Sequence, residues 1–275
     1  MNTTVKRSIF GVLFLAVMIG CLLGGRYGFL PLFLFIQVQM FREFYRMTTG
    51  NAHKTLQNLS IALAVISFCL VFLYLGPVSI PKAVLGVIPL LLVCLMAGMV
   101  IMHKDFKDCA YIFTALVYIG LPMSLSPFVV STPEGYSGLL MLSFFIIIWS
   151  SDVGAYCFGL LLGRKVWPAK MCPNISPKKS WAGFVGGWLT VLLAAYILLK
   201  SGLMDFPLVH VLIMASLMHV TGVFGDLFES LWKRNAGIKD SGNIIPGHGG
   251  LLDRFDSSLF AIPTGYVYLI LFELV

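Results

Sequence analysis

Apolar residues dominate this sequence in long runs, and polar residues gather in the short segments between them. A helix needs about 20 mostly apolar residues to cross a bilayer. The runs predict nine membrane-spanning helices, over residues 8–24, 26–41, 56–76, 80–102, 108–130, 136–158, 182–200, 206–228 and 258–275. The second run follows the first through Gly24, Gly25 and Arg26, so these two helices are expected to form a tight hairpin.

Two longer polar stretches remain outside the runs, over residues 159–181 and 229–257. Irregular backbone is not stable against lipid, so both stretches are expected at the membrane surface or inside a polar cavity. The pattern predicts an all-α polytopic membrane protein with a cavity that faces the cytoplasm and without a separate soluble domain. Within it, residues 1–135 would form an N-terminal membrane-spanning region and residues 136–275 a C-terminal catalytic region.

Composition agrees with a bilayer as the natural solvent. Of the 275 residues, 59% are hydrophobic and 11% are charged, whereas an ordinary soluble domain has about 25% charged residues. The net charge is +7. Because the charges are sparse and lie between apolar runs, they favour anionic headgroups or phosphorylated substrates over nucleic acid. The six cysteines include no CxxC pair, so the sequence indicates neither a zinc site nor a disulfide framework.

The distribution of Lys and Arg predicts the orientation. With nine spans, 16 of the 19 Lys and Arg residues fall on one side, and only Arg26, Lys82 and Lys200 fall on the other. The positive-inside rule then places the N-terminus and both long polar stretches in the cytoplasm. Nine of the twelve carboxylates fall on the same side. Acidic residues follow no topology rule, so their concentration beside the bases needs another cause.

The stretch 226–257 carries the strongest chemical signal. Asp226, Glu229, Ser230 and Lys233 recur at helical spacing and share one face. A second polar group follows after a glycine-rich segment, at Asp253, Asp256 and Ser257. Carboxylates are hard ligands for Mg²⁺, Lys and Arg bind phosphates, and glycines let backbone N–H groups approach a phosphate. A single charge at a span end is usually an anchor, but this concentration of carboxylates and bases favours a functional site.

Two further segments add candidate residues. Asp152 lies deep in an apolar run, where an acid is costly and usually marks a site. Ala155, Gly159 and Gly163 follow it at a spacing that favours helix packing. Lys178 and Lys179 come after a Ser-Pro turn, and either phosphate binding or simple membrane anchoring would explain them. Two histidines in the eighth run are expected to be packed, neutral side chains; they are His210 and His219.

The run Ser230-x2-Lys233-Arg234-x4-Lys239-Asp240-x-Gly242-x5-His248-Gly249-Gly250-x2-Asp253-Arg254-x-Asp256 resembles the signature of the phosphatidate cytidylyltransferases, also called CDP-diacylglycerol synthases. Asp152-x-Gly154-Ala155-Tyr156 and Ser176-Pro177-Lys178-Lys179 are similar to two further motifs of that family, in the same order. The resemblance extends from about residue 149 to 257. One departure is that Ala182 stands where the family pattern has Glu, so the role of that carboxylate must be absent or supplied elsewhere.

The resemblance implies that CMP passes from CTP to phosphatidate, giving CDP-diacylglycerol and pyrophosphate for phospholipid synthesis. The implied cofactor is Mg²⁺, with a second cation left open, and the implied metal ligands are Asp226, Asp253, Glu229 and Asp256. The implied catalytic residues are Asp226, Lys233, Asp253 and His248. The implied substrate-binding residues are Asp152, Lys178, Lys179, Ser230, Arg234, Lys239, Gly249, Gly250 and Arg254.

The same resemblance implies CTP, phosphatidate and membrane lipids as partners, and no nucleic acid; a homodimer is left open. It also implies a bacterial inner membrane protein with a cytoplasmic active site. Three alternatives remain at this stage: a transporter of an anionic solute, a CTP-dependent polyprenol kinase, and a non-catalytic assembly protein. A transporter would need a polar path from both sides, yet the predicted outer connectors carry few polar charges.

Overall fold

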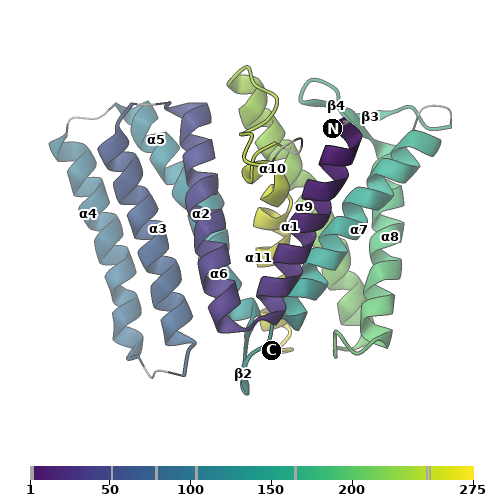
Figure 1. Ribbon diagram of the computed structural model, residues 1–275, viewed down its shortest axis with the longest axis horizontal. Helices are drawn as coiled ribbons and strands as arrows, with labels where there is room; N and C mark the ends of the chain where they lie inside the picture. Colours follow the sequence, from purple (N-terminus) through teal and green to yellow (C-terminus); the bar gives the residue numbers. More distant parts are fainter. Residues whose placement is uncertain are drawn as a thin grey trace. The chain divides into compact units, whose positions relative to one another are not determined.

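A computed structural model describes residues 3–50, 52–77, 80–102, 105–163, 166–245, 247 and 249–275. Helices dominate it (Figure 1), which confirms the all-α membrane class predicted from the sequence. The helices are α1 (Thr3–Leu23), α2 (Arg26–Thr48), α3 (Lys54–Tyr74), η1 (Lys82–Gly86), α4 (Val87–Ile101), α5 (Phe106–Ala115), η2 (Leu116–Gly120), α6 (Leu121–Val129), α7 (Leu139–Leu161), α8 (Trp181–Lys200), α9 (Leu208–Asn235), α10 (Leu252–Phe255) and α11 (Ser258–Leu271). The described strands form two short antiparallel pairs, β1 (Ser131–Thr132) with β2 (Gly135–Tyr136), and β3 (Lys170–Cys172) with β4 (Ser176–Ser180).

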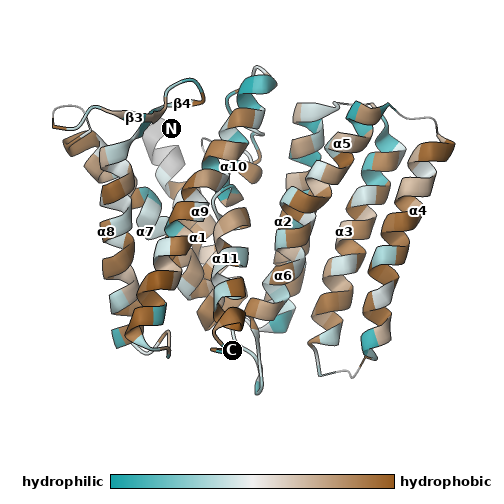
Figure 2. Cartoon of the chain, turned by 180° about the vertical axis from the view of Figure 1, so that it is seen from behind, coloured by the Kyte–Doolittle hydropathy of each residue, from teal (hydrophilic) through white to brown (hydrophobic). Residues whose placement is uncertain are grey.

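Each of the nine predicted spans overlaps a helix of the described chain. Within the described residues, six helical stretches are long and apolar enough to cross a membrane, over 54–74, 82–101, 106–129, 139–161, 181–200 and 208–235. The protein is therefore an integral membrane protein, while the total of nine spans stays a prediction. Figure 2 shows the apolar residues spread along these helices. Two helices continue beyond the apolar runs that predicted them, because α2 extends to Thr48 and α9 to Asn235.

The chain forms two compact units: unit 1 comprises residues 1–137 and 240–253, and unit 2 comprises residues 138–239 and 254–275. The glycine-rich part of the signature thus belongs to unit 1, whereas the helices before and after it belong to unit 2. The predicted membrane regions 1–135 and 136–275 stay a prediction.

Aromatic rings join α2 to α3 inside unit 1. The ring of Phe29 stacks on Phe33 at 4.2 Å between centroids, and on Phe68 and Phe72 of α3 at 6.1 and 6.0 Å. All four side chains are buried. Such offset aromatic contacts add to the burial of the rings themselves. They hold the two helices together at the ends that lie away from their connection.

Small residues let α7 and α8 pack closely inside unit 2. A Cβ atom at Gly183 would lie 2.8 Å from the carbonyl oxygen of Ala155, and one at Gly187 would lie 2.9 Å from that of Ser151. The backbones of α7 and α8 approach so closely that no side chain fits at these two positions. This agrees with the helix-packing interpretation of the small residues. Helix α9 packs against α7, α8 and α11.

Candidate active site in unit 2

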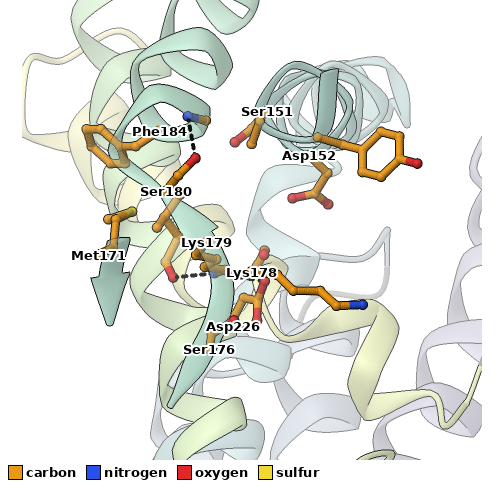
Figure 3. Close-up of a pocket in the computed structure, with 14 residues that line it drawn as sticks. Ser151, Asp152, Met171, Ser176, Lys178, Lys179, Ser180, Phe184 and Asp226 are labelled. Atoms are coloured by element: carbon orange, nitrogen blue, oxygen red, sulfur yellow. Dashed lines mark hydrogen bonds and ion pairs between the residues drawn. The ribbon is translucent and has the colours of Figure 1, made fainter. Parts of the chain in front are cut away.

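A cavity of about 360 Å³ lies in unit 2 among α7, α8, α9 and strand β4. Its walls include four side chains singled out from the sequence: Asp152, Lys178, Lys179 and Asp226. Figure 3 shows the carboxylates of Asp152 and Asp226 facing the same space. The structure therefore brings together polar residues from three separate parts of the sequence.

Strand β4 places the two lysines in the cavity wall. The strand ends at Ser180, directly before α8. The side chain of Ser180 caps that helix, because its hydroxyl accepts a hydrogen bond of 3.1 Å from the backbone N–H of Gly183. Such a cap satisfies one of the unpaired donors of the first helical turn. Ser180 is buried, so the cap fixes the junction between the lysine-bearing strand and α8.

An ion pair crosses the cavity wall from β4 to α9. The ammonium group of Lys179 lies 2.8 Å from Oδ2 of Asp226, and it also donates a hydrogen bond of 3.2 Å to the carbonyl oxygen of Val223. The hydroxyl of Ser230 donates to Oδ1 of Asp226 at 3.2 Å, from one turn further along α9. The Asp226 side chain is 32% exposed, so it is held in place but still open to the cavity.

Acidic side chains concentrate around this ion pair. Burial, together with the neighbouring carboxylates of Asp226, Glu229 and Asp152, raises the pKa of Asp256 well above its usual value. Among the described residues, no three His, Cys, Asp or Glu side chains form a ready-made metal ligand set. The donor chemistry nevertheless fits a divalent cation, because carboxylate oxygens are the ligands Mg²⁺ prefers and a cation would relieve their mutual repulsion.

The last turns of α9 hold three further predicted residues. Glu229 is fully buried and forms an ion pair with Lys233, which is also buried. A buried pair of this kind is costly to break, because removal of one partner leaves a charge without compensation. Arg234 donates a hydrogen bond of 3.2 Å from its Nε to the carbonyl oxygen of Ile175, which ties α9 to the turn before β4. Their roles toward substrate stay predictions.

The remaining predicted bases of the signature lie at the surface. Lys239, at the end of the segment that follows α9, and Arg254, in α10, are both exposed within the described chain. The charge of Arg254 acts on Asp152, so this arginine lies near the cavity. Position 182, where the family pattern has Glu, is a buried alanine in the first turn of α8.

The glycine-rich part of the signature is organised by Asp253 in unit 1. Oδ2 of Asp253 accepts hydrogen bonds from the backbone N–H groups of Ser241 at 2.9 Å and Gly250 at 2.8 Å. Gly249 has φ of +86°, a conformation that other residues rarely adopt. His248 lies outside the described residues. Asp226 and Asp253 belong to different units, so their predicted sharing of a metal stays a prediction.

Sequence reasoning missed Glu43, a fully buried carboxylate on α2. It accepts hydrogen bonds from the backbone N–H groups of Leu251 at 3.0 Å and Leu252 at 2.8 Å, and from the hydroxyl of Ser241 at 3.0 Å. A carboxylate thus fixes the glycine-rich segment against α2. The available signal was an acid within a run of aromatic residues, between Phe41 and Phe44.

Five hydroxyl groups of the cavity wall were not among the predicted site residues, namely those of Ser151, Tyr156, Ser176, Ser180 and Ser257. The sequence marked Ser257 only as part of a polar group, and Tyr156 and Ser176 only as motif positions. Ser151 precedes Asp152, so the signal was a second polar residue within one apolar run. Its hydroxyl lies 2.7 Å from Nδ1 of His219, which is buried. His210 likewise pairs with the hydroxyl of Tyr268 at 2.9 Å. Both histidines are therefore packed among polar partners inside unit 2.

Comparison with known proteins gives a family for this arrangement. The profile of the cytidylyltransferase family matches residues 5–272. The chain is 41% identical over 170 residues to a phosphatidate cytidylyltransferase of Bacillus subtilis (strain 168), covering 61% of each protein. It is 37% identical over 167 residues to that of Staphylococcus haemolyticus (strain JCSC1435), covering 60% of this chain and 61% of the relative. It is 39% identical over 169 residues to that of Staphylococcus aureus (strain COL), with the same coverage. The aligned part thus spans about three fifths of these relatives' length. The chain belongs to the cytidylyltransferase family.

Proposed function

We propose that this protein transfers CMP from CTP to phosphatidate, giving CDP-diacylglycerol and pyrophosphate. Family membership and the names of the relatives support the reaction class. The structural observation that carries the proposal is the Lys179–Asp226 ion pair in the wall of the unit 2 cavity, opposite Asp152. Anionic substrates need the lysines, and a phosphate-bound cation needs the carboxylates.

In the proposed reaction, an oxygen of the phosphatidate phosphate attacks the α-phosphorus of CTP. The new bond joins that oxygen to phosphorus, and the bond from the α-phosphorus to the bridging oxygen breaks as pyrophosphate leaves. The attacking oxygen is already anionic, so the site needs little general-base chemistry. Binding and positioning of the phosphates therefore supply most of the rate enhancement.

Residues of the cavity wall, together with further predicted residues outside it, divide this work. Lys178 and Lys179 bind phosphate oxygens, and Lys179 exchanges its contact with Asp226 for a contact with substrate. Ser230 keeps the Asp226 carboxylate oriented through its hydrogen bond. Asp226, Asp256 and Asp152 would hold Mg²⁺ in unit 2, with Asp253 as the further ligand predicted from the sequence. The bound cation would neutralise negative charge on the phosphates.

The site is proposed to face the cytoplasm of a bacterial inner membrane. CTP is a cytosolic solute and phosphatidate is a membrane lipid, so a polar cavity at the cytoplasmic end of the helices serves both. The excess of Lys and Arg in the connectors on that side supports the orientation. The proposed reaction does not require a homodimer.

The test is an assay of the purified protein in detergent with CTP, phosphatidate and Mg²⁺. We expect CDP-diacylglycerol and pyrophosphate in equal amounts, loss of both on chelation with EDTA, and recovery when Mg²⁺ is restored. A parallel reaction with a dolichol-type alcohol in place of phosphatidate tests the polyprenol kinase alternative. Phosphorylated alcohol without CDP-diacylglycerol would overturn the proposal, and so would uptake of an anionic solute into vesicles without either product.

Asp253→Asn separates two roles within this proposal. Turnover falls whether Asp253 binds a cation or only holds the glycine-rich segment. A segment-holding role also lowers the thermal unfolding temperature, because the amide oxygen is a weaker acceptor for the Ser241 and Gly250 N–H groups. We expect a folded variant with less turnover and a lower unfolding temperature. Unchanged turnover would remove Asp253 from the site.

A further inference from the structure

A second polar cavity lies in unit 1, far along the sequence from the catalytic motifs. It has a volume of about 430 Å³ and lies where the last turns of α2 meet the first turns of α3 (Figure 1). We call it the Arg42–Arg46 pocket, and its walls are Arg42, Tyr45, Arg46, Gly50, Gln57, Asn58 and Ile61. The catalytic signature contributes no residue to these walls.

The two arginines are placed to act together. They are four residues apart on α2, so their side chains leave the same face of the helix. Both are exposed. Within the described part of the chain, neither guanidinium forms a hydrogen bond or an ion pair with a protein group, and no acidic residue lines the pocket. Two cations beside one cavity without a counter-charge repel each other, and a bound anion would remove that repulsion.

Hydrogen bonds hold two of the other wall residues, Gln57 and Tyr45, so the pocket is a built feature of the fold. The amide nitrogen of Gln57 donates to the carbonyl oxygens of Ala52 at 2.6 Å and Gly50 at 3.2 Å, and to the hydroxyl of Thr49 at 2.8 Å. These bonds fix the turn between α2 and α3. The buried ring of Tyr45 is anchored through a hydrogen bond between its hydroxyl and that of Ser60.

The chemistry of the walls selects a phosphate group. A guanidinium offers a planar fork of donors that matches phosphate oxygens, and two such forks can bind one dianionic or monoanionic phosphate. Helix α3 also begins at this end, and the residue before it, His53, provides no side-chain cap. The positive end of a helix adds to the attraction for an anion. Ile61 gives one wall an apolar character beside a membrane-spanning helix, which suits a phosphate that carries acyl chains.

We propose that the Arg42–Arg46 pocket is an accessory binding site for a phosphate group, carried by an anionic phospholipid headgroup or by a free phosphate. It is separate from the proposed catalytic cavity in its residues and does not depend on the proposed reaction. The pocket holds the phosphate group at the end of α2, the helix whose Glu43 fixes the glycine-rich segment.

The test is a titration of the full-length protein in detergent with short-chain phosphatidylglycerol, which is not the proposed substrate, followed by native mass spectrometry. Short-chain phosphatidylcholine provides the zwitterionic comparison, and inorganic phosphate provides the soluble arm. We expect the wild type to bind phosphatidylglycerol in preference to phosphatidylcholine. The double variant Arg42→Gln/Arg46→Gln should bind phosphatidylglycerol about tenfold more weakly, because it loses both charge-assisted donors.

A matched control removes two positive charges elsewhere in unit 1. Lys82 and Lys107 are exposed and lie outside the pocket, so Lys82→Gln/Lys107→Gln should bind phosphatidylglycerol as the wild type does. Arg42→Lys/Arg46→Lys keeps the charge but loses the forks, and it should bind with intermediate affinity. This variant also keeps the test decisive if the Gln variant does not fold.

The outcomes identify the source of the phosphate or overturn the site. Arginine-dependent binding of phosphatidylglycerol that inorganic phosphate does not displace assigns a lipid headgroup. Arginine-dependent binding of inorganic phosphate without phosphatidylglycerol binding assigns a soluble phosphate. Equal binding of both probes by the wild type and the two arginine variants would overturn the proposal, and so would an equal loss in the Lys82→Gln/Lys107→Gln control.

Discussion

Two carboxylates of unit 1, those of Glu43 and Asp253, differ from Asp226 of unit 2 in what satisfies them. In unit 1, Glu43 is fully buried and accepts hydrogen bonds from backbone N–H groups, and Asp253 does the same within its own segment. In unit 2, Asp226 is 32% exposed in a cavity wall, and its contacts are with side chains, those of Lys179 and Ser230. These acids are thus of two kinds.

The difference indicates which acids are available to a ligand. A carboxylate whose oxygens accept backbone N–H groups positions the chain, and its loss leaves several donors unsatisfied. A carboxylate that faces a cavity and pairs with a lysine can exchange that partner for a cation when an anionic substrate takes the lysine. We therefore expect substitutions in unit 1 to act first on stability, and substitutions in the unit 2 cavity to act first on turnover.

The largest expected effect is on turnover, from Asp226→Asn. The amide keeps the shape of the side chain and an acceptor for Ser230 but loses the negative charge. We expect CDP-diacylglycerol formation to fall by about 100-fold or more, the usual scale for the loss of one preorganised electrostatic group. The thermal unfolding temperature should stay close to that of the wild type.

A matched control for Asp226→Asn is Asp205→Asn, which changes an exposed acid in the connector between α8 and α9 of the same unit. It should retain full turnover. If Asp226→Asn turned over as fast as the wild type, Asp226 would belong with the acids that only stabilise the fold. The contrast between the two units would then be lost.

Glu43→Gln should have the largest effect on stability. The neutral amide is a weaker acceptor, and its NH₂ group would face one of two backbone N–H donors, because Leu251 and Leu252 donate to different oxygens of Glu43. We expect a loss of about 3 kcal/mol, as for the removal of a buried charge with several donors, measured as a lower unfolding temperature in detergent. Glu134→Gln, at an exposed position of unit 1, should leave the unfolding temperature unchanged. Equal unfolding temperatures for the two variants would contradict the structural role of Glu43.

Gly250→Ala tests the same contact from the opposite side. A Cβ atom there would lie 2.4 Å from Oε2 of Glu43 and 2.7 Å from the backbone nitrogen of Gly242, so the segment must shift. We expect a loss of about 2 kcal/mol, within the usual cost of overpacking. Gly98→Ala in α4 meets nothing within 4 Å and should instead stabilise the protein by up to about 1 kcal/mol. Destabilisation by both substitutions alike would show a general intolerance of alanine.

Hydropathy predicted most of the fold, because helices in a bilayer must be long and apolar, but it placed the ends of α2 and α9 too early. Both helices continue through polar residues, since hydrogen bonding within a helix does not stop where its apolar surface ends. In the site, helical spacing and local motifs indicated Asp152, Lys179 and Asp226, which the cavity brings together. Glu43 was not predictable in this way. Its partners in the glycine-rich segment lie 198 to 209 residues away and include backbone N–H groups, which every sequence offers equally.

The smallest expected effect concerns the cap that joins the two lysines to α8. Ser180→Ala removes the acceptor for the Gly183 N–H and should cost about 1 kcal/mol. Because strand β4 ends at this residue, a loosened cap also displaces Lys178 and Lys179, so we expect the Michaelis constant for CTP to rise a few-fold. Ser201→Ala, at the exposed opposite end of α8, should change neither quantity. A lower unfolding temperature of Ser180→Ala with an unchanged Michaelis constant would show that the cap stabilises α8 without positioning the lysines. The contrast between residues that stabilise the fold and residues that bind substrate would then also hold within unit 2.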